Sequence, residues 1–275
     1  MLRKLYYSLS PAMRLLVRKI YYWPVDIFSS KNDLIPPRGL IYTGRGDFLK
    51  VGKYWAQKFI NEGGLLPHHH ILDIGSGIGR MAVGLTGYIN GGKYEGFDAV
   101  AQGVEWCTKN IQSRYRHFNF TYVDLNNDLY KSTGLDAATF HFPYNNSKFD
   151  FAISISVFTH MLDNEVENYL AQSGRVLKSG GILMATFFIV DEFYTPESGG
   201  FHFHHDYGNY LLMDDVVKSA NVAFRKDYLF ELCRSKGFEI LSYVPGYWQK
   251  SVPMVDNDFQ DYLKLKNVGV GQTSS

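Results

Sequence analysis

The stretch Ile71-Leu72-Asp73-Ile74-Gly75-Ser76-Gly77-Ile78-Gly79-Arg80 decides the fold of this 275-residue chain. An apolar strand runs into three closely spaced glycines, and a helical pattern follows to about residue 88. Glycines at such a turn let the backbone approach a ligand at the N-terminus of the following helix. The stretch therefore predicts a parallel α/β sheet with a ligand site at the carboxyl end of its first strand.

The spacing of the glycines differs from that of a dinucleotide-binding turn. The pattern G-x-G-x-x-G would place its third glycine at position 80, where this chain has Arg80, and Gly79 comes one residue early. Asp73 precedes the first glycine by two residues, and a carboxylate there would repel a pyrophosphate but attract an ammonium group. The turn therefore favours a ligand with an ammonium group, and a nicotinamide-dependent oxidoreductase is the alternative.

Strand and helix patterns alternate from about residue 41 to 190, which is typical of a parallel α/β sheet. This part is predicted to hold helices over 47–61, 80–88, 102–114 and 163–177, and strands over 70–74, 94–98, 118–124, 149–156 and 182–190. A helix near 225–236 and two strands, 238–244 and about 259–266, are expected to follow. Three segments result: a basic helical extension (1–40), the core (41–190), and an acceptor loop with C-terminal elements that complete the sheet (191–275).

Two further acidic residues stand at the ends of predicted strands. Asp98 ends the second strand 19 residues after Gly79, where α/β folds place an acid on ribose hydroxyls. Asp124 closes the third strand, where a short polar side chain can meet the edge of an adenine. Taken alone, Asp124 is better explained as a cap or turn acid. Asp73, Asp98 and the glycines together indicate a ligand that contains a nucleoside.

These motifs resemble those of class I S-adenosylmethionine-dependent methyltransferases. The resemblance covers about residues 44–190, and it includes Phe149-Asp150, the stretch 154–161 and the stretch 175–181. It implies a Rossmann-like α/β fold with helices on both faces of a seven-stranded, mostly parallel sheet whose last strand is antiparallel. It also implies S-adenosylmethionine as cofactor and S-adenosylhomocysteine as product. The cofactor-binding residues that it implies are Asp73, Gly75, Ser76, Gly77, Gly79, Arg80, Asp98, Asp124, Leu125 and Ser156.

The flanking segments more weakly resemble methyltransferases of polysaccharide and glycolipid biosynthesis. These segments are 42–48, Gly246-Tyr247-Trp248 and Phe259-Gln260-Asp261, which are equally consistent with ordinary turn and strand chemistry. They favour O-methylation of a sugar hydroxyl in a glycan or glycolipid precursor. The alternatives are a small aromatic or lipid acceptor, and a non-catalytic, nucleotide-binding Rossmann-type protein.

A sugar hydroxyl is a poor nucleophile, so a base or a metal should assist its methylation. His160 follows the fourth strand at the ligand edge and is the leading candidate for the base; a capping or packing histidine is the alternative. The loop 201–206 follows the fifth strand and is expected to line the acceptor pocket with His202, His204 and His205. Because their spacing matches no strong metal signature, no metal site is predicted. The aromatic residues expected to pack on a pyranose are Phe158, Tyr194, Phe203 and Trp248.

Composition narrows the classes of partner. With 28 basic and 27 acidic residues the formal net charge is +1, which argues against a protein that binds nucleic acid. Cys107 and Cys233 form neither a metal motif nor a disulfide framework, so a reducing, cytoplasmic location is expected. No apolar run reaches the length of a membrane span, and Arg18-Lys19 interrupts the N-terminal one too early for a signal peptide.

The N-terminal segment 1–28 carries five basic residues and no acid before Asp26. Its apolar residues lie three or four apart, which predicts helix, and Pro11 is expected to divide it into two helices. The segment either packs on the core or over the active site, or rests as a basic amphipathic face on anionic lipid at the inner membrane surface. The sequence does not predict the oligomeric state.

Overall fold

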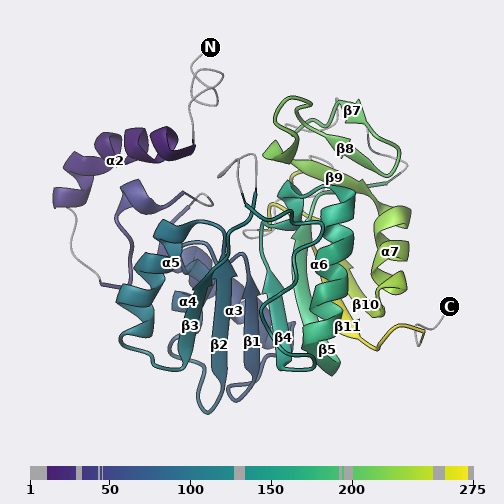
Figure 1. Cartoon of the computed structure of the whole chain (residues 1–275), viewed down its shortest axis with the longest axis horizontal. Coiled ribbons are helices and arrows are strands. Elements are labelled where there is room, and N and C mark those ends of the chain that lie inside the picture. Colours follow the sequence, from purple (N-terminus) through teal and green to yellow (C-terminus); the bar gives the residue numbers. More distant parts are fainter. Residues whose placement is uncertain are drawn as a thin grey trace.

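The computed structural model describes residues 11–28, 33–42, 44, 46–126, 134–191, 194, 201–249 and 258–271. Its main feature is a seven-stranded sheet with the strand order β10-β11-β5-β4-β1-β2-β3 (Figure 1). The strands are β1 (His70–Ile74), β2 (Lys93–Asp98), β3 (Phe118–Tyr122), β4 (Phe149–Ser154), β5 (Leu177–Phe187), β10 (Phe238–Val244) and β11 (Asp261–Asn267). Strand β11 is antiparallel to both of its neighbours, as the resemblance implies.

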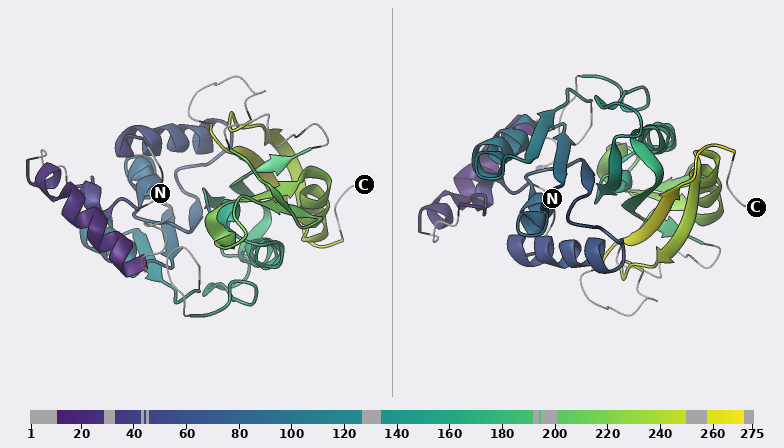
Figure 2. Two further views of the ribbon diagram at one scale, coloured as in Figure 1. Left: turned by 90° about the horizontal axis from the view of Figure 1, so that it is seen from above. Right: turned by 90° about the horizontal axis from the view of Figure 1, so that it is seen from below.

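Helices cover both faces of this sheet (Figure 2). The helices α3 (Phe48–Asn61), α4 (Arg80–Leu85) and α5 (Ala101–Cys107) contribute to one apolar cluster, and α6 (Asp163–Val176) and α7 (Lys226–Ser235) contribute to the other. Side chains of β1 alternate between the clusters, with Ile71 in the first and Leu72 in the second, because successive side chains of a strand point to opposite faces. The architecture confirms the predicted Rossmann-like fold of class I methyltransferases.

Several predicted element boundaries are wrong. Strand β5 begins five residues earlier than expected, because Gly180-Gly181 lies within the strand, where its register with β4 shifts. Strands β3 and β4 each end two residues early. Helix α5 ends at Cys107 and passes into a π-helical turn, η2 (Thr108–Gln112), instead of continuing to residue 114. Local irregularities of this kind leave the apolar pattern of the sequence unchanged.

The N-terminal extension forms one described helix, α2 (Pro11–Phe28). Pro11 is its first residue, where proline fits because the N–H that it lacks would have no partner in the helix. The first of the two helices predicted here falls on residues 1–10, which lie outside the described residues. Among the described helices, none is both long and apolar enough to cross a membrane.

A second sheet, which the sequence analysis did not predict, stands beyond the carboxyl end of β5. Its order is β6-β9-β8-β7, and its strands are β6 (Ile189–Val190), β7 (His205–Asp206), β8 (Tyr210–Leu212) and β9 (Val222–Arg225). Strands of two to four residues are too short for an alternating pattern to be recognised. Figure 1 shows this small sheet at the same end of the main sheet as α2.

Asp261, the first residue of β11, joins the small sheet to the main sheet. Its buried carboxylate accepts hydrogen bonds from Ile189 N (2.6 Å), Gly246 N (2.7 Å) and Trp248 Nε1 (2.8 Å). Burial raises the pKa of Asp261 to about 7, although these donors favour the ionised form. The flanking motifs 246–248 and 259–261 therefore meet at this carboxylate.

We expect Asp261→Asn to lower the free energy of unfolding by about 2–4 kcal/mol, because an amide NH₂ would replace one accepting oxygen and leave buried donors unpaired. Denaturant titration at pH 8 measures the effect. Glu239→Gln is the control, since Glu239 is exposed, lies 3.9 Å from Lys266, and should cost less than about 0.5 kcal/mol. Equal costs for the two substitutions would contradict the linking role of Asp261.

Candidate functional site

The glycine turn after β1 requires glycine at all three positions. Gly75, Gly77 and Gly79 have φ angles of +73°, +56° and +77°, in the left-handed region that side chains with a Cβ rarely adopt. A Cβ on Gly75 would also lie 2.4 Å from the Val157 side chain. The turn is held to β2 because the N–H groups of Gly75 and Ser76 both donate to Phe97 O, at 3.0 and 2.9 Å.

The Asp98 carboxylate fastens the glycine turn to the end of β2. Its Oδ2 accepts from Gly77 N (2.7 Å), and its Oδ1 accepts from Val100 N (2.8 Å) and from the Tyr42 hydroxyl (3.3 Å). Burial raises the pKa of Asp98, while these three donors lower it. Tyr42 belongs to the predicted motif 42–48, of which residues 43 and 45 lie outside the described residues.

Asp73 lies in the interior beneath the turn. Its carboxyl is buried and accepts a hydrogen bond from the buried hydroxyl of Tyr94 on β2, a partner that no sequence motif indicates. Desolvation raises the pKa of Asp73 to about 7, the Tyr94 hydroxyl opposes this shift, and the nearby Asp98 adds to it. Because Asp73 is buried and bonded to Tyr94, it would attract a ligand's ammonium group by longer-range electrostatics and not by a direct hydrogen bond.

Two other predicted cofactor residues direct their side chains away from the turn. Ser76 is buried, and its Cβ lies 2.8 Å from the position where Gly96 would carry a Cβ, so its side chain packs against β2. The Arg80 guanidinium donates to Gly44 O (3.4 Å) and lies over the Phe48 ring, 5.4 Å from its centroid. Burial lowers the pKa of Arg80, and Asp47 opposes this.

The structure places the predicted adenine residues beside Asp98. Val123 N donates to Asp98 O (3.1 Å), and Asp124 and Leu125 follow directly. Asp124 is exposed, and its Oδ1 accepts from the Tyr122 hydroxyl at 3.4 Å. Leu125 is buried and forms a bridge with Leu135. An exposed carboxylate and a buried apolar side chain thus follow one another at the edge of the sheet.

Ser156 adopts a left-handed conformation (φ +59°) just after β4, and such strain in a residue other than glycine clusters at functional sites. Its N–H donates to Thr186 Oγ1 (2.7 Å), and its hydroxyl donates to Gln260 Oε1 (2.8 Å). Gln260 Nε2 also lies 3.5 Å from Thr159 Oγ1. Thr186 and Gln260 therefore position Ser156. Of these two, only Gln260 stands in a motif that the sequence analysis noted.

His160 lies in a short 3-10 helix, η3 (Phe158–His160), and contacts the segment before β9. Its Nδ1 lies 2.9 Å from Ser219 O in η5 (Lys218–Ala220). A carbonyl oxygen only accepts, so Nδ1 carries the proton and Nε2 keeps its lone pair. Burial lowers the pKa of His160, although the carbonyls of Ser219 and Ala220 favour the protonated form. The imidazole is therefore neutral near pH 7.

The three loop histidines belong to the edge of the small sheet. The rings of His202 and His204 stack with centroids 5.5 Å apart, and Nδ1 of His205, in β7, lies 3.7 Å from Asp215 Oδ2. No contact in the described part of the chain brings them together with His160 in one cluster. Likewise, within that part, no group of three or more His, Cys, Asp or Glu side chains is arranged to hold a metal ion.

The expectation that four aromatic residues pack on a pyranose is wrong for three of them. Phe158 is fully buried and stacks on Phe187 with ring centroids 4.9 Å apart. Phe203 and Trp248 are also buried, in a cluster around Phe188. These rings stabilise the junction of the two sheets. Their burial depends on contacts between segments that are distant in the sequence, so their spacing in the sequence could not predict it.

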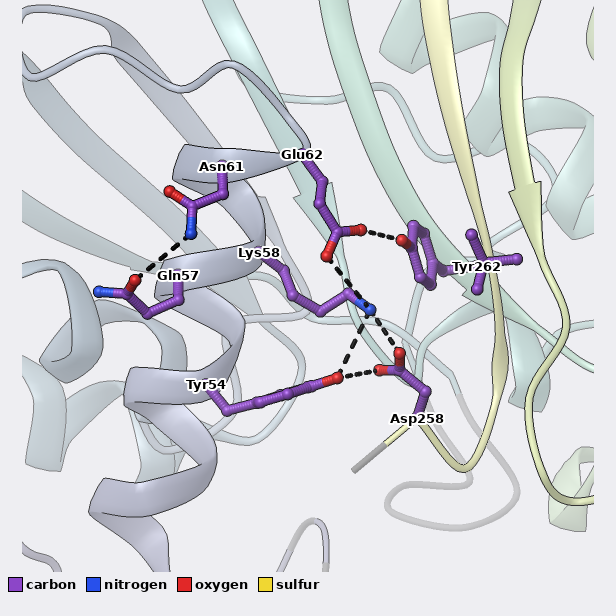
Figure 3. A pocket seen from close by; sticks show the side chains of 8 residues that line it. Tyr54, Gln57, Lys58, Asn61, Glu62, Asp258 and Tyr262 are labelled. Carbon is purple, nitrogen blue, oxygen red and sulfur yellow. Dashed lines mark hydrogen bonds and ion pairs between the residues drawn. The ribbon is translucent and has the colours of Figure 1, made fainter. Parts of the chain in front are cut away.

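A cavity of about 350 Å³ lies between α3 and the start of β11 (Figure 3). Its centre is the buried ammonium of Lys58, which donates to Asp258 and lies 4.1 Å from the centroid of the Tyr262 ring. The Tyr54 hydroxyl donates to Asp258 Oδ1 (2.8 Å). None of its lining residues is a predicted site residue. These contacts hold Asp258, and thereby the start of the segment that carries Gln260.

Comparison with known proteins agrees with this fold. Residues 72–185 match the profile of a family described as methyltransferase domain. The fold is similar to that of a putative sarcosine dimethylglycine methyltransferase from Galdieria sulphuraria (TM-score 0.55, 14% identity, 80% of this chain and 86% of that chain). It is also similar to the [4+2]-cyclase SpnF (0.54, 17%, 83% and 85%) and to a SAM-dependent methyltransferase from Methanosarcina mazei (0.51, 17%, 77% and 97%).

The raised pKa of Asp73 predicts a pH dependence of stability. Between the ordinary pKa of 3.8 and the folded value of about 7, the folded state binds more protons than the unfolded state. The free energy of unfolding should therefore fall as the pH rises. Between pH 5 and pH 8 the wild-type protein should lose roughly 3 kcal/mol more than the Asp73→Asn variant. Urea titrations of both proteins across this range test it, because Asp261 contributes equally to each. Parallel pH profiles would show that Asp73 ionises normally.

Proposed function

We propose that this chain, in which residues 72–185 form a methyltransferase domain, is an S-adenosylmethionine-dependent methyltransferase that acts on a sugar hydroxyl. The acceptor is a glycan or glycolipid precursor, and S-adenosylhomocysteine is the other product. The observation that carries the proposal is the glycine turn fastened by Asp98, with the exposed Asp124 next to it. The buried, unpaired cysteines Cys107 and Cys233 support a reducing, cytoplasmic location.

The residues at the turn fit this cofactor. The Asp98 carboxylate has about four lone-pair positions and three donors, so it can still accept from a ribose hydroxyl. The long bond from Tyr42 (3.3 Å) is the one that a ligand hydroxyl would replace most easily. Asp124 and Leu125 would hold the adenine. Gly75 and Gly77 would hold the methionine part, together with the main chain of Ser76 and Gly79.

When bound, the cofactor supplies a methyl group on a sulfonium, and the chain must align an acceptor oxygen with it. Alignment of this kind can lower a barrier by about 7–11 kcal/mol. Ser156 is fixed by Thr186 and Gln260, and Val157 lies against Gly75; the two residues directly precede η3, which carries His160. His160 presents a neutral Nε2 that can take the proton of the acceptor hydroxyl.

The small sheet supports a sugar acceptor. The stacked rings of Tyr207 and Tyr210 (5.3 Å, 3°) and the stacked imidazoles of His202 and His204 offer flat faces with polar edges, which suit a pyranose. A small aromatic or lipid acceptor would use the same faces with fewer polar neighbours.

A non-catalytic or otherwise diverged protein is the rival from another class. A cyclase shares the fold at 17% identity, so the fold alone does not select methyl transfer. Conversion of S-adenosylmethionine to S-adenosylhomocysteine with a sugar acceptor that gains one methyl group, followed by mass spectrometry, distinguishes the two.

Asp98→Ala should weaken S-adenosylmethionine binding by about 10–100-fold in calorimetric titration, since it removes a charged hydrogen bond to the ribose and loosens the turn. Asp150→Ala is the matched control. Asp150 also accepts from a backbone N–H, that of His70 (2.9 Å), but at the amino edge of the sheet, so binding should be unchanged. Tight binding of NAD without binding of S-adenosylmethionine would overturn the proposal.

His160→Asn should lower kcat by about 10²–10⁴-fold with little change in cofactor affinity, because the amide keeps the donor to Ser219 O and removes the Nε2 lone pair. His68→Ala, in the loop before β1, is the control and should retain full activity. A loss below tenfold would exclude His160 as the base and direct attention to His202, His204 and His205. Activity abolished by a chelator and restored by a divalent ion would instead indicate a metal.

A further inference from the structure

From Leu16 to Phe28, the side of α2 that faces solvent is apolar. Placed 100° apart per residue, its exposed apolar side chains span one continuous half of the helix surface. We call this set the outer face: Leu16, Val17, Ile20, Tyr21, Trp23, Ile27 and Phe28, which are 44% to 88% exposed. Monomeric soluble proteins rarely expose so many adjacent large apolar side chains, so this surface is expected to have a partner.

The opposite side of α2 is polar and holds the helix to the rest of the chain. The Asp26 carboxylate accepts from Arg38 N (2.6 Å) and Gly39 N (3.0 Å) at the start of η1 (Arg38–Leu40). Arg18 Nε donates to Arg38 O (3.4 Å), and the guanidinium lies over the Tyr22 ring. These contacts turn the outer face away from the core. The described contacts of α2 with the rest of the chain are made by its polar side, and the outer face is left exposed.

The charge pattern of the N-terminal segment in the sequence favours an anionic partner. Five basic residues and no acid precede Asp26 in the sequence, and the Asp26 carboxylate is directed inward onto η1. A second copy of the chain would bring the same cations together without an acid of α2 to face them, which disfavours a symmetric helix pair. An anionic lipid surface instead offers acyl chains to the apolar side chains and phosphates to the cations.

We propose that the outer face of α2 lies in the interface of an anionic phospholipid bilayer, with the helix parallel to the membrane plane. The helix has 18 residues, carries Pro24 inside, and is too polar to span a membrane. Its Trp23 and Tyr21 are of the amphipathic aromatic type that is enriched at membrane interfaces.

This seating places the ligand edge of the sheet at the bilayer. Segment η1, held by Asp26, is followed within two residues by Tyr42, whose hydroxyl donates to Asp98. Figure 1 shows α2 and the small sheet at the same end of the main sheet. The acceptor would then be a sugar joined to a lipid anchor, which approaches from the membrane; this last step rests on the proposed function.

The four tryptophans allow a direct test with the full chain. Trp55, Trp106 and Trp248 are buried, so Trp23 is the exposed indole among them. Vesicles of phosphatidylcholine and phosphatidylglycerol that carry brominated acyl chains should quench Trp23 fluorescence and bind the protein in flotation. Pure phosphatidylcholine vesicles should bind several-fold less. Trp23→Phe should remove the quenching while most of the binding remains.

Ile20→Glu should lower the vesicle partition coefficient by about tenfold or more, because it places a charge in the centre of the outer face. Val216→Glu is the matched control, since Val216 is an exposed apolar residue outside α2, and its binding should be unchanged. Absence of wild-type binding to anionic vesicles would overturn the proposal. A concentration-dependent dimer that Ile20→Glu dissociates would also overturn it, because the outer face would then bind a second copy of the chain. Calorimetric titration with S-adenosylmethionine, which Ile20→Glu should not alter, tests the proposed function independently of the membrane surface.

Discussion

The hydrogen bond from Gly77 N to the Asp98 carboxylate is the interaction on which the ligand edge depends. It links the turn after β1 to the end of β2, and the same carboxylate accepts from Val100 N and from Tyr42. Three glycines with left-handed φ angles can bring the backbone close to a ligand only while something holds the turn open. Asp98 does this and retains acceptor capacity, so the residue that shapes the site is also one that can bind.

The edge carries an energetic cost that the rest of the fold must offset. Asp73 and Asp261 are buried carboxyls whose pKa values rise to about 7, so ionising either one costs more free energy in the folded protein than in the unfolded chain. Asp261 is compensated by three donors from separate segments, whereas the described hydrogen bond of Asp73 comes from Tyr94 alone. The large alternating core on both faces of the sheet supplies the apolar burial against which such polar groups are tolerated.

The small sheet and helix α2, which lie outside the main sheet, contact opposite sides of the ligand edge. His160 contacts Ser219 O in η5, just before β9 of the small sheet, on one side of the ligand edge. Helix α2 reaches the opposite side through η1 and Tyr42, with its apolar face outward. The ligand edge therefore lies between the small sheet, which contacts His160, and α2, whose apolar face is exposed.

The sequence by itself determined the features whose cause is local. The apolar pattern of the strands predicted the core strands, and the glycine spacing with Asp73 and Asp98 predicted the turn. Both are local features, because left-handed backbone and the alternation of side chains along a strand depend on neighbouring residues. Only the tertiary structure decided the features that join distant segments. The contact of His160 with Ser219 spans 59 residues, and that of Ser156 with Gln260 spans 104. Phe158, Phe203 and Trp248 became core residues in the same way. Burial and hydrogen-bond partners depend on which chain segments pack together, and a pattern within one segment cannot contain that information.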